Sequence, residues 1–102
     1  MSGAVLAIDI GSNTIKCLLG RVENCAVARL YERTLDRRIM GSGALVPNAA
    51  DVVSDSVSLF VREAAAFAPS FKTVAVATSA LRDSPRRGEI TAAVAENTGV
   101  EI

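Results

Sequence analysis

The chain has 102 residues, 11 basic and 11 acidic side chains, and no histidine. This length suits one compact domain, and the 50% of residues that are apolar can form a packed core, which argues against disorder. The absence of histidine excludes a Ser-His-Asp triad, a Cys-His pair and zinc sites with imidazole ligands. A net charge of zero gives no general electrostatic reason to expect nucleic acid or an acidic membrane surface as a partner.

Two further features limit the chemistry and the location of the protein. Cys17 and Cys25 do not have the spacing of a Cys-x-x-Cys pair, so we interpret them as reduced thiols. No apolar run approaches the roughly 20 residues of a membrane span, and residues 1–3 do not resemble the start of a secretory signal. We therefore expect a cytoplasmic protein without a membrane partner.

The amino-terminal part of the chain predicts an antiparallel meander of three strands. Residues 4–8 are a continuous apolar run, typical of a strand that is buried on both faces. Residues 11–14 break this run with small turn-forming side chains, and a second strand follows over about residues 15–22. Glu23-Asn24 then predicts a tight turn into a third strand over about residues 25–34.

The middle of the chain predicts a loop followed by an amphipathic helix. Residues 35–47 contain arginines, glycines and a proline, which are typical of a loop. Asn48 and Asp51 form a capping pair at the start of the helix, and Pro69 ends it. Its apolar stripe, with alternating helical spacings, consists of Val53, Val57, Phe60, Ala64 and Phe67.

The remaining residues predict a strand, a second helix and the beginning of another strand. Residues 73–77 form a second buried strand, and Val100 to Ile102 begin a further one. Ser84 before Pro85 starts the helix between them, and Gly99 closes it. The inward side chains of this helix are Ile90, Ala93 and Val94.

These elements follow the order β-β-β-α-β-α. A strand that follows a helix usually returns parallel to an earlier strand through a right-handed crossover. The predicted fold class is therefore α/β, with a mixed sheet in which the carboxyl ends of the first and fourth strands lie side by side. The fourth strand lies at an edge of this sheet, and an exposed apolar edge predicts self-association of the chain.

Two polar segments follow the first and fourth strands and so share one edge of the predicted sheet, where ligands of open α/β sheets bind. The first segment combines a carboxylate, a glycine that lets an anion approach the backbone, and side-chain donors. It consists of Asp9, Gly11, Ser12, Asn13 and Thr14. In the second segment Thr78 and Ser79 add hydroxyl groups, and Arg82 adds a bidentate fork for phosphate oxygens. Asp9 repels phosphate but can hold a Mg²⁺ ion between itself and the phosphate.

Each segment also has a purely structural interpretation. Residues 11–14 are typical of a hairpin turn. The hydroxyl groups of Thr78 and Ser79 can simply bond to the backbone at the end of a strand. Arg82 alone is typical of a solvated surface arginine. Arg37 and Arg38 are typical of an exposed loop pair, and the alternative interpretation is a substrate clamp. The functional interpretation depends on the convergence of both segments on one sheet edge.

The motif D-I-G-S-N-T over residues 9–14, together with A-T-S-A-L-R-D over residues 77–83, resembles the exopolyphosphatase/guanosine pentaphosphate phosphohydrolase family. That family belongs to the superfamily of actin, sugar kinases and Hsp70 chaperones, whose first domain is ribonuclease H-like. The resemblance covers Val5 to Ile102. It implies that residues 1–102 are the amino-terminal part of a ribonuclease H-like phosphatase domain, with the rest of that domain and a second domain absent.

The resemblance implies hydrolysis of terminal phosphate from inorganic polyphosphate or guanosine pentaphosphate, by Mg²⁺-assisted in-line attack of water. Asp9 is carried over as the metal ligand. The residues carried over as phosphate-binding are Gly11, Ser12, Asn13, Thr14, Thr78, Ser79 and Arg82. The family's catalytic glutamate and second phosphate loop come later in its sequence, so we expect the catalytic base beyond Ile102. We accordingly expect no catalytic residue in this chain and no activity of the chain alone. Homodimerisation of the parent protein is left open.

One segment departs from the family, and other functions remain open. Residues 37–43 stand where the family has an R-L-G-x-G loop and are shorter, which leaves a substrate contact by Arg38 in doubt. The main alternative is a non-catalytic module that binds polyphosphate or an alarmone, or that pairs with another subunit. A kinase of the same superfamily, whose first loop is also D-x-G, is a third possibility.

Overall fold

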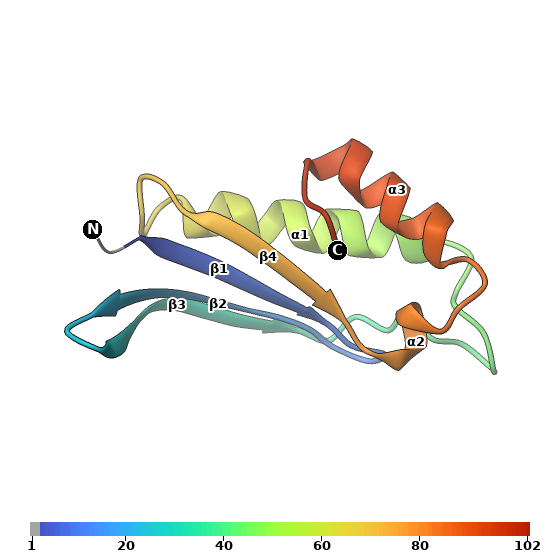
Figure 1. The fold of residues 1–102 in the computed structure, drawn as a ribbon. Helices are drawn as coiled ribbons and strands as arrows, with labels where there is room; N and C mark the ends of the chain where they lie inside the picture. The colour runs from blue at the N-terminus through green and yellow to red at the C-terminus, as the bar shows by residue number, and fades with distance from the viewer. Residues whose placement is uncertain (1–2) are drawn as a thin grey trace.

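A computed structural model describes residues 3–102 as a four-stranded mixed sheet with helices on one of its faces (Figure 1). Strands β1 (Ala4–Ile10), β2 (Ile15–Glu23) and β3 (Ala26–Leu35) pair in antiparallel fashion in chain order. Strand β4 (Lys72–Ala77) pairs in parallel with β1. The strand order is β3-β2-β1-β4, which confirms that β4 lies at an edge and that the carboxyl ends of β1 and β4 are neighbours.

Three helices complete the fold. Helix α1 (Ala49–Ala64) packs against β1, β2 and β3, α2 (Ser79–Arg82) is a single turn, and α3 (Arg87–Thr98) packs against α1 (Figure 1). The predicted α/β class and element order are therefore confirmed, with one short helix added. None of the helices described for residues 3–102 is long and apolar enough to cross a membrane.

The core lies between α1 and the covered face of the sheet. Successive side chains of a strand point to opposite faces, so every second residue of β1 enters this core. The buried residues of β1 are Ala4, Leu6, Ile8 and Ile10, and those of the predicted α1 stripe are Val53, Val57, Phe60 and Ala64. Phe67, which was also predicted in the stripe, is 53% exposed because α1 already ends at Ala64, before Pro69. Its ring stacks on that of Tyr31 instead, with centroids 5.1 Å apart.

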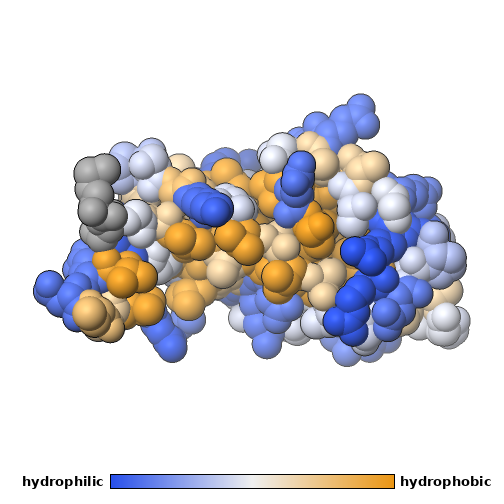
Figure 2. Space-filling model, viewed as in Figure 1, coloured by the Kyte–Doolittle hydropathy of each residue, from blue (hydrophilic) through white to orange (hydrophobic). Residues whose placement is uncertain are grey.

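The opposite face of the sheet is open, and the prediction that β1 and β4 are buried on both faces is wrong. Val5, Val74 and Val76 are 39%, 41% and 56% exposed, respectively. Figure 2 shows apolar side chains gathered along the middle of the molecule. All helices of residues 3–102 that contact the sheet lie on its other side, so the apolar residues of this face have no covering layer among the described residues.

The turn between β2 and β3 is one residue later than predicted. Asn24 and Cys25 have positive φ angles of 51° and 64°, as the two central residues of a tight hairpin turn require. Strand β3 therefore begins at Ala26, and Cys25 is part of the turn rather than of the strand.

The ends of the helices agree only partly with the predictions. Asn48 precedes α1 but makes no capping hydrogen bond through its side chain. Helix α3 begins later than predicted, because the Ser84 hydroxyl accepts a hydrogen bond from the Arg86 N–H (3.1 Å) in a turn before the helix. Gly99 ends α3 with a φ of 75°, as predicted.

The segment after α3 does not form the strand that was predicted to begin there. Val100, Glu101 and Ile102 have no regular secondary structure and no place in the four-stranded sheet. Val100 is instead buried in the core, and Ile102 is half-buried and packs against it. The apolar side chains of this segment thus contribute to packing, without the backbone pairing that a strand requires.

Candidate functional site

The carboxyl ends of β1 and β4 bring the two polar segments together. Ile10 and Ala77 are the last paired residues of the parallel ladder. Beyond them the Thr78 N–H donates a hydrogen bond to the Ile10 carbonyl (3.0 Å), and the Thr78 hydroxyl donates to the same oxygen (3.3 Å). Thr78 therefore joins the segments through its backbone and its side chain. Its hydroxyl bonds to the backbone at a strand end, which is the structural role considered for this residue.

Residues 11–14 form the hairpin loop between β1 and β2. The Gly11 N–H donates to the Thr14 carbonyl (2.9 Å), and the Ser12 carbonyl accepts from the Ile39 N–H (3.0 Å). A Cβ atom on residue 11 would lie 2.9 Å from the Thr14 carbonyl oxygen, which is closer than such atoms approach. Gly11 is thus needed to close the loop, and its N–H is used within the loop rather than offered to an anion.

A cavity of about 410 Å³ lies between this hairpin loop and the connection from β4 to α3. Ser12 lines it from the first polar segment, and Ser79 and Asp83 line it from the second. Leu45 belongs to a third wall, formed by the loop before α1. We call this space the Ser12–Ser79 cavity, because residues from both predicted segments line it.

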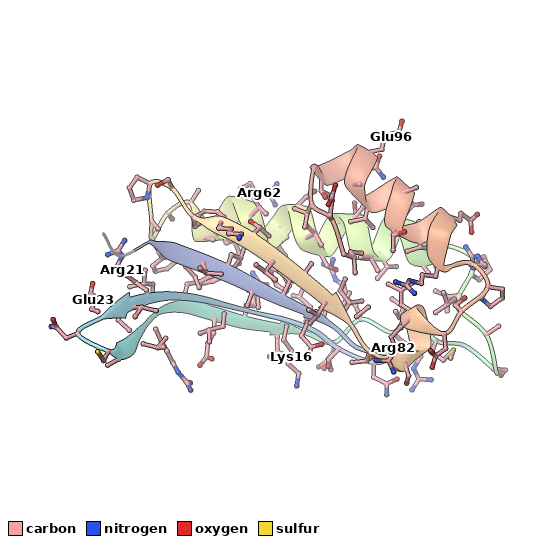
Figure 3. All side chains as sticks on the ribbon, in the orientation of Figure 1. Lys16, Arg21, Glu23, Arg62, Arg82 and Glu96 are labelled. Carbon is pink, nitrogen blue, oxygen red and sulfur yellow. The ribbon has the colours of Figure 1, made fainter. Side chains whose placement is uncertain are left out.

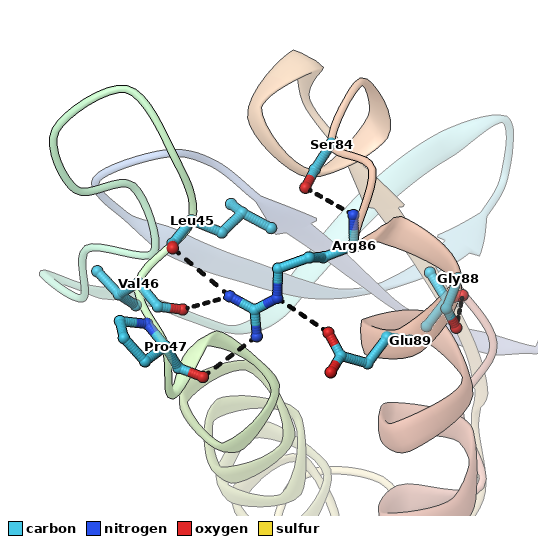
Figure 4. A network of polar contacts seen from close by, with 8 residues as sticks. Leu45, Val46, Pro47, Ser84, Arg86, Gly88 and Glu89 are labelled. Atoms are coloured by element: carbon cyan, nitrogen blue, oxygen red, sulfur yellow. Dashed lines mark hydrogen bonds and ion pairs between the residues drawn. The ribbon is translucent and has the colours of Figure 1, made fainter.

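Arg86 holds two walls of the Ser12–Ser79 cavity against each other (Figure 4). Its guanidinium donates to the carbonyls of Val46 (2.9 Å) and Pro47 (3.2 Å) in the loop before α1, and to the Glu89 carboxylate (2.9 Å) on α3. Sequence reasoning missed this residue, because nothing local to Ser84-Pro85-Arg86 indicates that the arginine reaches carbonyl groups so much earlier in the chain.

Asp9 lies outside this cavity. It is exposed on the open face of the sheet, beside Lys16 in the antiparallel register, and both residues line a separate cavity of about 510 Å³. The remaining predicted residues of the first segment, Asn13 and Thr14, are exposed and half-buried, respectively, in the hairpin loop.

Arg82 also lies outside the Ser12–Ser79 cavity. It projects from α2 near the end of β4 (Figure 3), and its side chain is 60% exposed. Its Nε lies 3.6 Å from the Asp83 carboxylate. Arg82 lines a third cavity, of about 240 Å³, together with Ile102 from the segment after α3. The Ile102 side chain is apolar, so it lines this cavity but cannot act as a catalytic acid or base.

The residues present offer one ligand position for the Mg²⁺ ion that the resemblance implies. Among residues 3–102 no three His, Cys, Asp or Glu side chains come together as a metal-binding group. Mg²⁺ needs only one or two protein carboxylates when phosphate oxygens and waters complete its octahedral shell. Asp9 fits this minimal role, because its carboxylate is exposed directly before the hairpin loop, although the adjacent Lys16 ammonium opposes a cation there.

A cluster of ionisable side chains lies away from these cavities, between β3 and α1. The Glu63 carboxylate accepts hydrogen bonds from Arg33 and from the Tyr31 hydroxyl, which lower its pKa below the ordinary value. Burial, followed by the hydrogen bond to Glu63, raises the pKa of Tyr31. Burial also raises the pKa of the Cys17 thiol, which is consistent with a structural cysteine. The cluster joins the sheet to α1.

The fold is the mixed α/β class that the sequence predicts. No model of a protein family matches the sequence, and no curated protein matches it in sequence. Solved structures do match, and they belong to the family that the two motifs resemble.

Three of these structures illustrate the likeness. The Aquifex aeolicus PPX-GPPA enzyme aligns with 99% of this chain and 36% of its own, with a TM-score of 0.85 and 20% identity. An exopolyphosphatase from Cytophaga hutchinsonii aligns with 96% of this chain and 32% of its own, with a TM-score of 0.83 and 19% identity. An exopolyphosphatase-like protein aligns with 98% of this chain and 32% of its own, with a TM-score of 0.82 and 24% identity. The chain thus spans about a third of the length of the solved structures it matches, and at these identities the likeness shows the fold.

Proposed function

We propose that this chain forms the phosphate-binding part of a phosphohydrolase similar to the exopolyphosphatases. The observation that carries this proposal is the junction at the ends of β1 and β4, where Ser12 and Ser79 line one cavity and Thr78 joins their two segments. The resemblance of both segments to the family's motifs, and the likeness of the fold to solved exopolyphosphatases, support the same function.

The proposed substrate is a terminal phosphoanhydride, in inorganic polyphosphate or in guanosine pentaphosphate. Hydroxyl groups of Ser12 and Ser79 donate hydrogen bonds to the terminal phosphate in the cavity. Arg82 reaches that phosphate only if its long side chain leaves Asp83, which its 60% exposure permits. Asp9 would hold Mg²⁺, which would neutralise negative charge only on a phosphate that extends out of the Ser12–Ser79 cavity toward the open face, because Asp9 does not line that cavity.

Weak binding and no turnover are the expected properties of the chain alone. Among residues 3–102, Asp83 is the only carboxylate that lines the Ser12–Ser79 cavity, and its negative charge opposes an anion there. No residue is assigned as the base that activates water, because Asp83 lies on an exposed turn and Glu89 is paired with Arg86. A base beyond Ile102 would lie outside residues 3–102, so its existence and position stay a prediction.

Calorimetric titration of the chain with inorganic polyphosphate, in parallel with an assay for released phosphate, tests the proposal. We expect weak binding that the double change Ser12→Ala, Ser79→Ala reduces severalfold, and no release of phosphate. Ser70→Ala is the matched control, because Ser70 is an exposed serine in the α1–β4 connection, outside the cavity. Equal binding by the double variant and the unchanged chain would contradict the assigned cavity.

Two further outcomes concern catalysis. Release of phosphate by the chain alone, abolished by Asp9→Asn, would overturn the expectation that the chain is inactive. In a longer protein that contains this chain, turnover that is lost on Asp9→Asn supports the hydrolase, whereas binding of polyphosphate without turnover would favour the non-catalytic module.

A further inference from the structure

A fourth cavity, whose walls are rich in arginine, lies between the segment that follows β3 and the flank of α1. Its volume is about 550 Å³, and it shares no lining residue with the Ser12–Ser79 cavity. Arg37 and Arg38 line it from the segment, and Arg62 lines it from α1, where Figure 3 labels it. Of the described residues in its walls, only Asp55 is acidic. We call this space the arginine groove.

The arginines of this groove lack the ion pairs that other arginines of the chain make. Arg33 and Arg86, for example, pair with glutamates. Within residues 3–102, neither Arg37, Arg38 nor Arg62 has a carboxylate oxygen within 4.0 Å. Three guanidinium groups and the single carboxylate of the groove leave two net positive charges (3 − 1 = 2). The residues that line the groove therefore carry a net positive charge.

Arg37 is held in place before any ligand arrives. Its Nη1 donates a hydrogen bond to the Ser56 hydroxyl (3.0 Å), and that hydroxyl donates in turn to the Val52 carbonyl (2.7 Å). Ser56 is fully buried, so this contact anchors the guanidinium to the body of the protein. A side chain that is already ordered loses less conformational freedom when it binds a partner.

We propose that the arginine groove binds an oligophosphate, with Arg37 as the fixed anchor and Arg38 and Arg62 as flanking cations. Guanidinium groups match phosphate oxygens in bidentate geometry, and they remain charged at every physiological pH. The α1 residues that line the groove run from Val52 to Arg62, a rise of roughly 15 Å along the helix axis. That length suits a linear chain of phosphates better than a single orthophosphate ion.

Two double variants with equal changes in net charge distinguish specific binding in the groove from a general effect of the protein's charge on polyphosphate binding. Arg38→Glu with Arg62→Glu alters two groove residues, and Arg29→Glu with Lys72→Glu alters two exposed cations on β3 and β4. We expect long-chain polyphosphate to bind the groove variant about tenfold more weakly at low salt, and the control variant less than about twofold more weakly. Asp55→Asn, which removes the only negative charge of the groove, is expected to tighten binding a few fold.

The ligand can be a free oligophosphate or the distal part of a chain whose end lies in the Ser12–Ser79 cavity. Titration with tripolyphosphate distinguishes the two. If the groove binds a free oligophosphate, tripolyphosphate and long-chain polyphosphate lose affinity equally for the groove variant. If one chain spans both cavities, only long-chain polyphosphate loses affinity. Ser12 and Ser79 are unchanged in all these variants, so failure of the groove is separable from failure of the proposed function. An equal loss in the groove and control variants, or no tightening with Asp55→Asn, would overturn the proposal.

Discussion

Both faces of the sheet carry apolar residues of β1 or β4, but these residues differ strongly in burial. On the covered face Leu6 and Ile8 of β1 are no more than 1% exposed, whereas on the open face Val5, Val74 and Val76 are 39–56% exposed. Both sets are apolar, so the position of α1 and not the residue type decides which valines and leucines are buried. An apolar run thus predicts a strand, but it does not predict how many layers cover it.

The largest expected effect comes from removing a large side chain between the covered face and α1. Phe60→Ala leaves a cavity in the core and is expected to lower the free energy of unfolding by about 3–5 kcal/mol. Val76→Ala on the open face is the control, with an expected loss below about 1 kcal/mol, because Val76 is already 56% exposed. Urea denaturation of the three chains measures both values. Similar losses in the two variants would mean that the open face is covered in solution.

A smaller effect is expected at the edge where the two faces meet the polar loops. Gly11→Ala places a Cβ atom 2.9 Å from the Thr14 carbonyl oxygen and is expected to lower the free energy of unfolding by about 1–3 kcal/mol. It should also weaken polyphosphate binding, because the hairpin loop must shift. Gly88→Ala in α3 is the control, since nothing lies within 4 Å of the added methyl group and alanine favours a helix by about 0.5–1 kcal/mol. Destabilisation of equal size at both glycines would contradict the crowded loop.

The smallest effect concerns the rim of the covered face, where Glu63 joins β3 to α1. Its pKa is lowered mainly by the hydrogen bond from Arg33, so the stabilising contribution of the carboxylate is present above its ordinary pKa of 4.5 and is lost as the pH falls through the lower folded-state value. Glu63→Gln should therefore be less stable than the unchanged chain at pH 7, and the difference should shrink in acid. Denaturation measured from acid to neutral pH checks this. A difference that stays constant with pH would show that the charge of Glu63 contributes nothing.

The sequence predicted the fold well, because periodicity reports directly on which side chains can share a core. The stripe of Val53, Val57 and Phe60 identified the buried face of α1, and the parallel return of β4 placed both polar segments at one edge. The predicted ends of helices were less accurate where a single hydrogen bond decides the first helical residue. At the start of α3 the Ser84 hydroxyl accepts a hydrogen bond from the Arg86 N–H, in a turn before the helix.

The end of the chain shows a second limit of such predictions. Val100 and Ile102 are apolar and alternate with Glu101, which is typical of a strand, yet they pack against the core without joining the sheet. A period of two reports which side chains are buried. It does not report whether the backbone between them finds a neighbouring strand.

The structure places the two polar segments at one edge of the sheet, as predicted, but it separates several of their side chains. Asp9 lies between Ile8 and Ile10, which are both buried, so the alternation of a strand turns its side chain toward the open face. That separation from Ser12 and Ser79 was readable from the sequence. The position of Arg82 was not, because it depends on the single turn of α2, which no periodic pattern indicates.

Arg86 also makes the shape of the Ser12–Ser79 cavity depend on segments that are far apart in the chain. The loop before α1 is held by its own Met40–Leu45 bridge, by the hydrogen bond from the Ile39 N–H to the Ser12 carbonyl, and by carbonyl groups that converge on the Arg86 guanidinium. Contacts between distant parts of a chain close long loops, which costs conformational entropy. We therefore expect the loop before α1 and the start of α3 to take their final shape together, so that long-range contacts complete the Ser12–Ser79 cavity.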